Sequence, residues 1–266
     1  MISSVEKSEK VPDYIQFIQQ NEKRQNIINW YEEGKLLIFD DFLDESWLDK
    51  IWELSWISES TDLRIKKAKQ NSLLAPIVNR SHILYEFSEN PGIIQIQIRQ
   101  LYAWIKEFVK IIFKEYNIIS ENWTWRLTET RQDTMHLDSY ADQNNDLHNL
   151  RIFVNLDNLP RIWRTSYSVE DILEFYKSKA LHVPNKHPNE INDILNSYIV
   201  CDSLPYHQIN FMPGTIWMVN TQIISHQGWF GNRMAAFTFR IAPESMFDRK
   251  INFINRVNRK IKELHE

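Results

Sequence analysis

Three side chains in the second half of the sequence are of the types that hold a divalent metal ion. His136 and Asp138 lie two positions apart in "TMHLDSY", and His226 follows ninety residues after His136 in "TQIISHQGWF". A His-x-Asp pair says little by itself, and an isolated histidine is more often a buried, hydrogen-bonded residue than a ligand. Each histidine, however, lies at the expected end of a strand in the same region. The sequence therefore predicts His136, Asp138 and His226 as the ligands of a catalytic metal.

Two histidines and one carboxylate, with two of them close in sequence and the third far away, are the facial triad of non-haem Fe(II) oxygenases. Such a triad holds one face of the metal and leaves room for a chelating co-substrate and O₂. The charge of Asp138 also offsets part of the charge of the metal. Two other uses stay open, because the same ligands suit a zinc hydrolase and a metal-free binding protein could use the three residues structurally.

A co-substrate such as 2-oxoglutarate needs a cation for its far carboxylate, and two arginines are suitably placed. Arg240 lies fourteen residues after His226, at the end of the strand-like run "AAFTFR", and Arg151 lies fifteen residues after His136 in "LRIFVNL". The planar fork of an arginine binds a carboxylate through two parallel hydrogen bonds. We expect Arg240 to be this anchor, with Arg151 as the alternative, although a strand-end arginine also commonly meets solvent.

A stretch without lysine indicates an anionic substrate. Between Lys114 and Lys177 the chain has no lysine but five arginines, whereas a solvated face would usually mix the two: Arg126, Arg131, Arg151, Arg161 and Arg164. Trp163 stands between two of these arginines and could form an apolar wall against a substrate ring. The sequence therefore predicts four substrate-binding residues, which are Arg131, Arg161, Trp163 and Arg164.

The periodicity of the sequence predicts a helical first part and a β-rich second part. We expect helices over 13–32, ending before Gly34, over 45–54 and over 91–116, with a short strand at 35–43. Period-two runs then predict strands at 122–130, 150–158, 207–212, 215–220 and 234–241, with Pro213-Gly214 as a turn. Several short strands in succession favour a sandwich or barrel.

These elements suggest one domain covering residues 1–266. Its expected parts are a mainly helical layer (1–116), a β core (117–245) and an amphipathic C-terminal helix (246–266). A helical insertion at 161–205 interrupts the core and carries two weak helical patterns, "VEDILEFYKSKA" and "PNEINDILNSYI". We expect this insertion to act as a lid that keeps water from the reacting site.

Composition indicates a soluble protein of a reducing compartment. Hydrophobic residues make up 43% of the 266 residues and charged residues 25%, as in ordinary globular proteins. The net charge of −4 argues against nucleic acid as a partner, and a single cysteine, Cys201, excludes an intrachain disulfide. No run has the length of a membrane span. We expect a cytoplasmic protein without an obligate protein partner, and peripheral contact with the inner face of the membrane stays open.

The sequence resembles the Fe(II)/2-oxoglutarate-dependent dioxygenase superfamily, whose fold is the double-stranded β-helix, or jelly roll. Within it, residues 130–245 resemble the Kdo (3-deoxy-D-manno-octulosonic acid) 3-hydroxylases, which oxidise a sugar of lipopolysaccharide. The likeness consists of ordered segments: "TMHLDSY", "LRIFVNLDNLPRIWR", "VEDI", "FMPGTIWMVNTQIISH" and "FTFRIAPESM".

This resemblance implies Fe(II) as the cofactor, with 2-oxoglutarate and O₂ as co-substrates. It implies His136, Asp138 and His226 as the iron ligands, and it places Arg151, Arg161, Trp163 and Arg164 on the family's arginine-tryptophan stretch. The chain departs from the family at "TSYSVE" and at Arg240, where the family usually has an apolar residue. We therefore expect a jelly-roll hydroxylase acting on an aliphatic C–H bond of an anionic, small or lipid-linked sugar substrate, with Kdo as the leading case. Free amino acids and natural-product intermediates stay open as alternatives.

Overall fold

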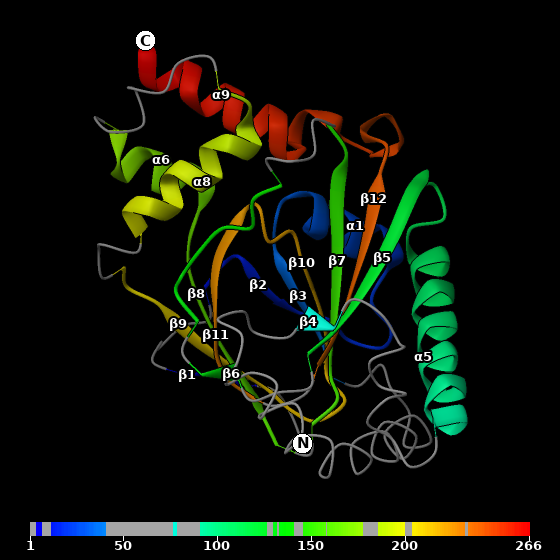
Figure 1. The fold of residues 1–266 in the computed structure, drawn as a ribbon. Helices are drawn as coiled ribbons and strands as arrows, with labels where there is room; N and C mark the ends of the chain where they lie inside the picture. The colour runs from blue at the N-terminus through cyan, green and yellow to red at the C-terminus, as the bar shows by residue number, and fades with distance from the viewer. Residues whose placement is uncertain are drawn as a thin grey trace.

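Two β-sheets form the centre of the molecule in the computed structural model. The structure describes residues 4–6, 12–40, 77–78, 91–126, 130–131, 133–140, 146–157, 159–177, 186–199, 204–231 and 234–266. Helices α1 and α5 lie beside one sheet, and α6, α8 and α9 form a separate group near the C-terminus (Figure 1). In the part of the chain just given, no helix is both long and apolar enough to cross a membrane.

The larger sheet has seven strands and the smaller sheet five. The larger sheet runs in the order β2 (Ile15–Phe17), β3 (Leu36–Phe39), β10 (Ile216–Val219), β7 (His148–Asn155), β12 (Met234–Ile241), β5 (Ile118–Arg126) and β4 (Ile77–Val78). The smaller sheet runs in the order β1 (Ser4–Glu6), β9 (His207–Phe211), β8 (Arg161–Ser168), β11 (Ile224–Gly231) and β6 (Thr130–Arg131). All pairings are antiparallel except that of β2 with β3.

The chain passes back and forth between the sheets from β5 to β12. Strands β5, β7, β10 and β12 lie in the larger sheet, whereas β6, β8, β9 and β11 lie in the smaller one. Eight antiparallel strands divided in this way form a double-sheet jelly roll. The predicted double-stranded β-helix core is therefore confirmed.

The larger sheet buries its outer face under two helices, α1 (Arg24–Glu32) and α5 (Pro91–Ile112). Alternate residues of β7 and β12 supply this layer, because successive side chains of a strand point to opposite faces. The outward side chains join an apolar cluster: Leu150, Ile152, Val154, Ala235, Phe237, Phe239 and Ile241. The side chains between them face the smaller sheet.

A second apolar cluster fills the space between the sheets and continues under the C-terminal helices. It includes Phe153 of β7, Trp217 of β10 and Trp163 of β8. Helices α6 (Val169–Phe175), α8 (Pro188–Ile199) and α9 (Phe253–His265) contact one another and contribute Ile172, Leu195 and Phe253 to the same cluster. The helical insertion is thus packed onto the jelly roll.

Two predicted glycine positions are confirmed. Gly214 has a φ of 78° in the turn between β9 and β10, and Thr215 closes that turn by donating to Met212 O at 3.0 Å. Gly34 has a φ of 88° directly after α1 and donates to Tyr31 O at 2.9 Å. Both conformations lie in the left-handed region, which favours glycine.

The predicted helix 13–32 is wrong over its first half, since α1 begins only at Arg24 and residues 15–17 form β2. Residues 15–17 form a strand because they pair with the edge of β3. Leu36 N donates to Tyr14 O and Ile18 N donates to Ile38 O, both at 2.8 Å. The described part of residues 1–116 contains four short strands, β1 to β4, besides the helices α1 and α5. The expected helix 45–54 lies outside the described residues.

The predicted insertion begins too early, because residues 161–168 form β8 of the smaller sheet. The sequence of β8, "RIWRTSYS", does not show the alternation of apolar and polar residues expected of a strand. Its buried positions include Arg161 and Thr165 besides Trp163. The two helical patterns are confirmed as α6 and α8. The last predicted helix is confirmed as α9, which follows a 3-10 turn at Arg249–Ile251.

Candidate metal centre

The structure brings His136, Asp138 and His226 together between the sheets. One donor atom from each of the three lies within 4.8 Å of the others. Asp138 Oδ1 is 3.6 Å from His136 Nε2 and 3.9 Å from His226 Nε2. His226 is buried, whereas the other two are half-buried. The three donors therefore converge on one point.

Backbone hydrogen bonds of the smaller sheet fix the two histidines. His136 and His226 form an antiparallel bridge, with His136 N donating to His226 O at 3.0 Å and His226 N donating to His136 O at 2.9 Å. The two rings consequently lie 4.5 Å apart. His226 is the third residue of β11 and not at a strand end as predicted. The same backbone hydrogen bonds therefore hold both His226 and His136, although the two are far apart in the sequence.

Carbonyl oxygens select the tautomer of each histidine. His136 Nδ1 lies 2.8 Å from Thr134 O, and His226 Nδ1 lies 3.2 Å from Ile224 O. A proton on Nδ1 satisfies each contact and leaves the Nε2 lone pair directed at Asp138, as a metal ligand requires. Burial, together with His136 and Arg151, holds the pKa of His226 well below its usual value. The neutral ring is the form that binds metal.

The second oxygen of Asp138 is held by its own set of donors. Arg151 and Thr221 both donate to Asp138 Oδ2, and the hydroxyl of Tyr140 lies 3.5 Å from it. Arg151 also donates to Thr221 Oγ1 at 3.0 Å, and Asp138 N donates to Thr221 O at 2.8 Å. Asp138 therefore presents only Oδ1 to the histidines. Its charge is partly balanced by Arg151.

These donors fit a divalent metal ion. Two imidazole nitrogens and one carboxylate oxygen suit both Fe(II) and Zn²⁺, and second-sphere hydrogen bonds orient every one of the three ligands. Among the residues that the structure describes, His136, Asp138 and His226 are the one group of three metal-binding side chains whose donor atoms lie within 4.8 Å of one another.

Arg240 lies on the inner face of the larger sheet, near Tyr140. On β12 it shares a face with Ala236, which belongs to the inter-sheet cluster, and it is half-buried. Burial raises the pKa of Tyr140 to about 12, while a hydrogen bond with Thr221 and the charge of Arg240 act in the opposite direction. Arg151 of β7 pairs with Thr238 of β12. Thr238 is the inward-facing residue of β12 that precedes Arg240. Both arginines therefore face the interior.

Of the four predicted substrate residues, Trp163 is beside the metal donors. Its ring stacks on His226 with centroids 5.0 Å apart and meets Trp217 edge-on. Only 3% of Trp163 is exposed. Trp163 therefore forms an apolar wall next to His226.

Two arginines of that set, Arg161 and Arg164, have described surroundings. Arg161 is 1% exposed and packs so closely on Gly231 that a Cβ there would lie 3.0 Å from Arg161 Cγ. Arg164 points to the other face of β8, with its guanidinium 3.1 Å from the ring centre of Trp229 and 4.3 Å from that of Tyr206. Arg131 pairs with Phe230 through the backbone of β6, and its side chain lies outside the described part of the structure. The structure thus turns Arg164 away from the donors, whereas Arg161 is buried on the same face of β8 as Trp163.

Sequence reasoning missed Tyr140 and Thr221. Tyr140 continues the period-two series of His136 and Asp138, and that alternation could have revealed it. Thr221 gave no local signal, because it acts on a residue 83 positions away. Its role appears only when the fold brings the two segments together.

Comparison with known proteins finds similarity at the level of structure. No family model matches the sequence, and no curated protein matches it. Solved structures of the Kdo hydroxylase KdoO, a non-heme Fe(II) alphaketoglutarate-dependent dioxygenase, are similar to this chain. The complex with cobalt(II) has a TM-score of 0.66 at 16% identity, covering 94% of this chain and 96% of that chain. The complex with succinate and Fe(III) has a TM-score of 0.65 with the same identity and coverage.

The complex of that protein with alphaketoglutarate and Fe(III) is also similar, with a TM-score of 0.63 and coverage of 90% of each chain. At this identity the match establishes a shared fold over nearly the whole chain. The resemblance to the Kdo hydroxylases is therefore confirmed for the fold.

Proposed function

We propose that this protein is an Fe(II)- and 2-oxoglutarate-dependent dioxygenase that hydroxylates an aliphatic C–H bond. The observation that carries the proposal is the convergence of His136 Nε2, His226 Nε2 and Asp138 Oδ1 on one point. Each ligand has its second polar atom already bound by the protein. The fold shared with a dioxygenase of this cofactor class supports the same conclusion.

An Fe(II) ion held by these donors would supply the chemistry that couples O₂ and 2-oxoglutarate to hydroxylation, with succinate and CO₂ as the other products. The chain itself aims both imidazoles at the metal, keeps that of His226 neutral, and holds Asp138 by one oxygen. Arg151 balances the carboxylate charge. Trp163 excludes water from one side of His226, which limits side reactions.

Arg240 is the proposed anchor for the far carboxylate of 2-oxoglutarate. Arg151 already donates to the ligand Asp138 and to Thr221, so that it lies against the metal donors. The far carboxylate of a chelating co-substrate must lie beyond them. Arg240 occupies the next inward position along β12, close to Tyr140, and its guanidinium can bind a carboxylate through two hydrogen bonds.

For the substrate we propose an anionic, oxygen-rich molecule, with Kdo of lipopolysaccharide as the leading case. The support is the structural similarity to a Kdo hydroxylase. A free amino acid or a natural-product intermediate is the second candidate. It is favoured by the place of Arg164, whose guanidinium lies against Trp229 and Tyr206 on the other face of β8 and so does not face a substrate at the donors.

Replacement of the carboxylate ligand tests the reaction. Asp138→Ala should lower succinate formation from 2-oxoglutarate by more than about 100-fold, because loss of a ligand should exceed the 10- to 100-fold cost of losing a second-sphere partner. Its far-ultraviolet circular dichroism should match that of the wild type. Asp146→Ala is the matched control, since Asp146 is largely exposed and pairs only with His187 among the interactions seen at its side chain. Full turnover in Asp138→Ala would rule out this metal centre, and a wild type that consumes no 2-oxoglutarate would favour zinc hydrolysis.

Mass spectrometry tests the substrate. Lipid A–core extracts from cells with the protein should carry one additional oxygen on the inner-core Kdo, and this oxygen should be absent with Asp138→Ala. Unmodified Kdo, together with 2-oxoglutarate turnover that a free amino acid stimulates, would select the second candidate.

A further inference from the structure

Helix α8 is hydrogen-bonded to the segment that carries two of the three metal donors, His136 and Asp138. Leu137 lies between His136 and Asp138, and its backbone makes two hydrogen bonds with one side chain. Leu137 N donates to Asn196 Oδ1 and Asn196 Nδ2 donates to Leu137 O, both at 2.8 Å. Asn196 thus acts as a strand partner would and satisfies both polar groups of this residue.

A second asparagine of the helix joins the two segments that meet at the site. Asn192 Nδ2 donates to Asp138 O at 2.9 Å and to Gln222 O at 3.1 Å. Gln222 is the neighbour of Thr221, which holds the second oxygen of Asp138. Asn192 is fully buried. One amide therefore connects the ligand segment to the segment that orients the ligand.

A third residue of α8 extends the same row. Asn189 accepts the hydroxyl of Ser139 at its backbone oxygen at 2.9 Å, and its Oδ1 accepts from Gln222 Nε2 at 2.6 Å. Positions 189, 192 and 196 are spaced by three and four residues, so they share one face of the helix. The row follows the chain from Leu137 to Ser139.

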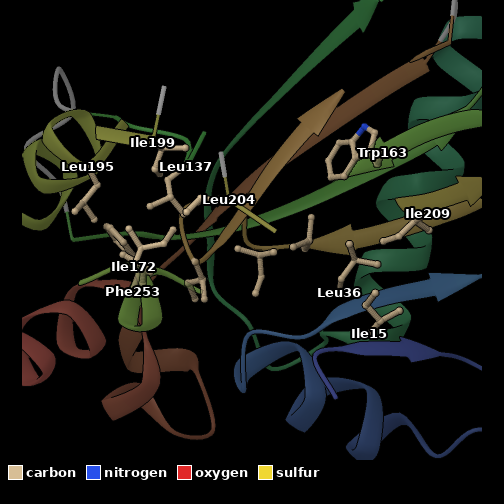
Figure 2. Close-up of a cluster of buried hydrophobic side chains, with 14 of the residues drawn as sticks. Ile15, Leu36, Leu137, Trp163, Ile172, Leu195, Ile199, Leu204, Ile209 and Phe253 are labelled. Carbon is tan, nitrogen blue, oxygen red and sulfur yellow. The ribbon is translucent and has the colours of Figure 1, made fainter. Parts of the chain in front are cut away.

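Apolar packing supports these bonds. The side chain of Leu137 is completely buried and belongs to the same cluster as Leu195 and Ile199 of α8, as Figure 2 shows. Helix α8 therefore cannot leave the site without exposing Leu137 and leaving the amide of Asn192 without its partners. Buried polar groups without partners cost about 1–3 kcal/mol each.

From these contacts we propose that Asn192 and Asn196 are positioning residues for the metal donors. By binding the backbone of Leu137 and Asp138, they keep His136 and Asp138 in register with His226. The inference rests on the proposed function, because it requires the three donors to bind a metal ion. Under this inference α8 is a fixed support of the ligand segment and not a moving part of the lid predicted at 161–205.

Metal affinity is the direct test, with Mn(II) as the probe and without co-substrate. Asn196→Ala and Asn192→Ala should each weaken Mn(II) binding to the folded protein by about 10-fold, in the range of second-sphere substitutions at metal sites. Ser197→Ala and Asp193→Ala are the matched controls, because both residues are exposed on the same helix, and they should bind Mn(II) as the wild type does. A purely structural asparagine would lower the melting temperature without changing the affinity of the folded protein.

Hydrogen exchange of the wild type gives a second measurement that needs no variant. The amide of Leu137 should exchange with the same protection as the amides of α8, because its acceptor is a side chain of that helix. Faster exchange at Leu137 than in α8, or unchanged Mn(II) affinity in both asparagine variants, would overturn the inference and leave the proposed function intact. A wild type that binds neither Mn(II) nor Fe(II) would instead refute the proposed function.

Discussion

The larger sheet has two faces that differ in chemistry, although the same strands supply both. On β7, Leu150 and Ile152 face outward into the layer under α1 and α5, whereas Arg151 between them faces inward and binds Asp138. On β12, Phe237 faces outward and Arg240 lies on the inner face. The outer faces of these two strands pack against helices, and their inner faces carry Arg151 and Arg240.

This division separates stability from chemistry within single strands. Apolar burial on the outer face stabilises the sheet by about 25 cal/mol for each Å² removed from water. The inner face must instead satisfy every buried charge and hydroxyl, because each one without a partner is costly. We therefore expect changes in the outer layer to alter stability and changes on the inner face to alter the chemistry of the site.

The largest effect on the outer layer should come from Phe237→Ala. Phe237 is 1% exposed and stacks against Tyr102 of α5 with ring centroids 6.4 Å apart. Removing a buried aromatic ring typically costs about 3–5 kcal/mol of unfolding free energy, through lost transfer energy and the cavity left behind. Denaturant unfolding measures this loss. Affinity for Mn(II), measured where the variant is folded, should equal that of the wild type.

The milder variant Phe237→Leu serves as the control, since it should keep most of the buried volume and lose less stability. Weaker Mn(II) binding by folded Phe237→Ala would show that the two layers are coupled, and the separation drawn above would then be wrong.

The outer layer was largely predictable from the sequence, whereas the inner layer was predictable only in part. The run "LRIFVNL" alternates between apolar outward residues and others, and its period two is plain. The strand β8 was missed because Arg161 and Thr165 share its inner face with Trp163, so that polarity does not mark the buried side. Alternation reveals a strand only when its two faces differ in polarity.

The candidate site, too, could be predicted from the sequence only in part. His136, Asp138 and His226 could be predicted from residue type, because few side chains bind metals. Thr221 and Asn196 could not, since hydroxyls and amides are common and their partners lie 83 and 59 residues away. Only the folded structure shows which of them reach the ligands.

Substitutions of the two inward-facing arginines, Arg240 and Arg151, should have different effects. Arg240→Ala should raise the KM for 2-oxoglutarate by roughly 10- to 100-fold, because a hydrogen bond to a charged group contributes about 1.5–3 kcal/mol. Arg151→Ala should chiefly weaken Mn(II) binding, because Arg151 donates to the ligand Asp138. If Arg151→Ala alone raises this KM, the two roles are exchanged.

The smallest effect concerns His148, a buried polar residue in the outer layer. It lies on the outward side of β7, is 1% exposed, and meets Tyr31 edge-on with ring centroids 5.6 Å apart. Neither of its ring nitrogens has a hydrogen-bond partner among the residues that the structure describes. Burial, with a smaller effect of Arg256, lowers the pKa of His148 from 6.5 to about 3.

Because the folded pKa of His148 lies below the unfolded one, the unfolded chain holds more protons between these two values. The free energy of unfolding is therefore unaffected by this histidine above pH 6.5 and falls as the pH drops below it, by up to about 1.4 kcal/mol per pH unit. His148→Leu removes the titrating group while keeping the layer apolar. Denaturant unfolding of the metal-free protein between pH 6.5 and 5 should then show a shallower loss of stability than in the wild type. Parallel curves for the two proteins would mean that His148 accepts a proton within the fold as readily as in the unfolded chain, which would contradict this prediction.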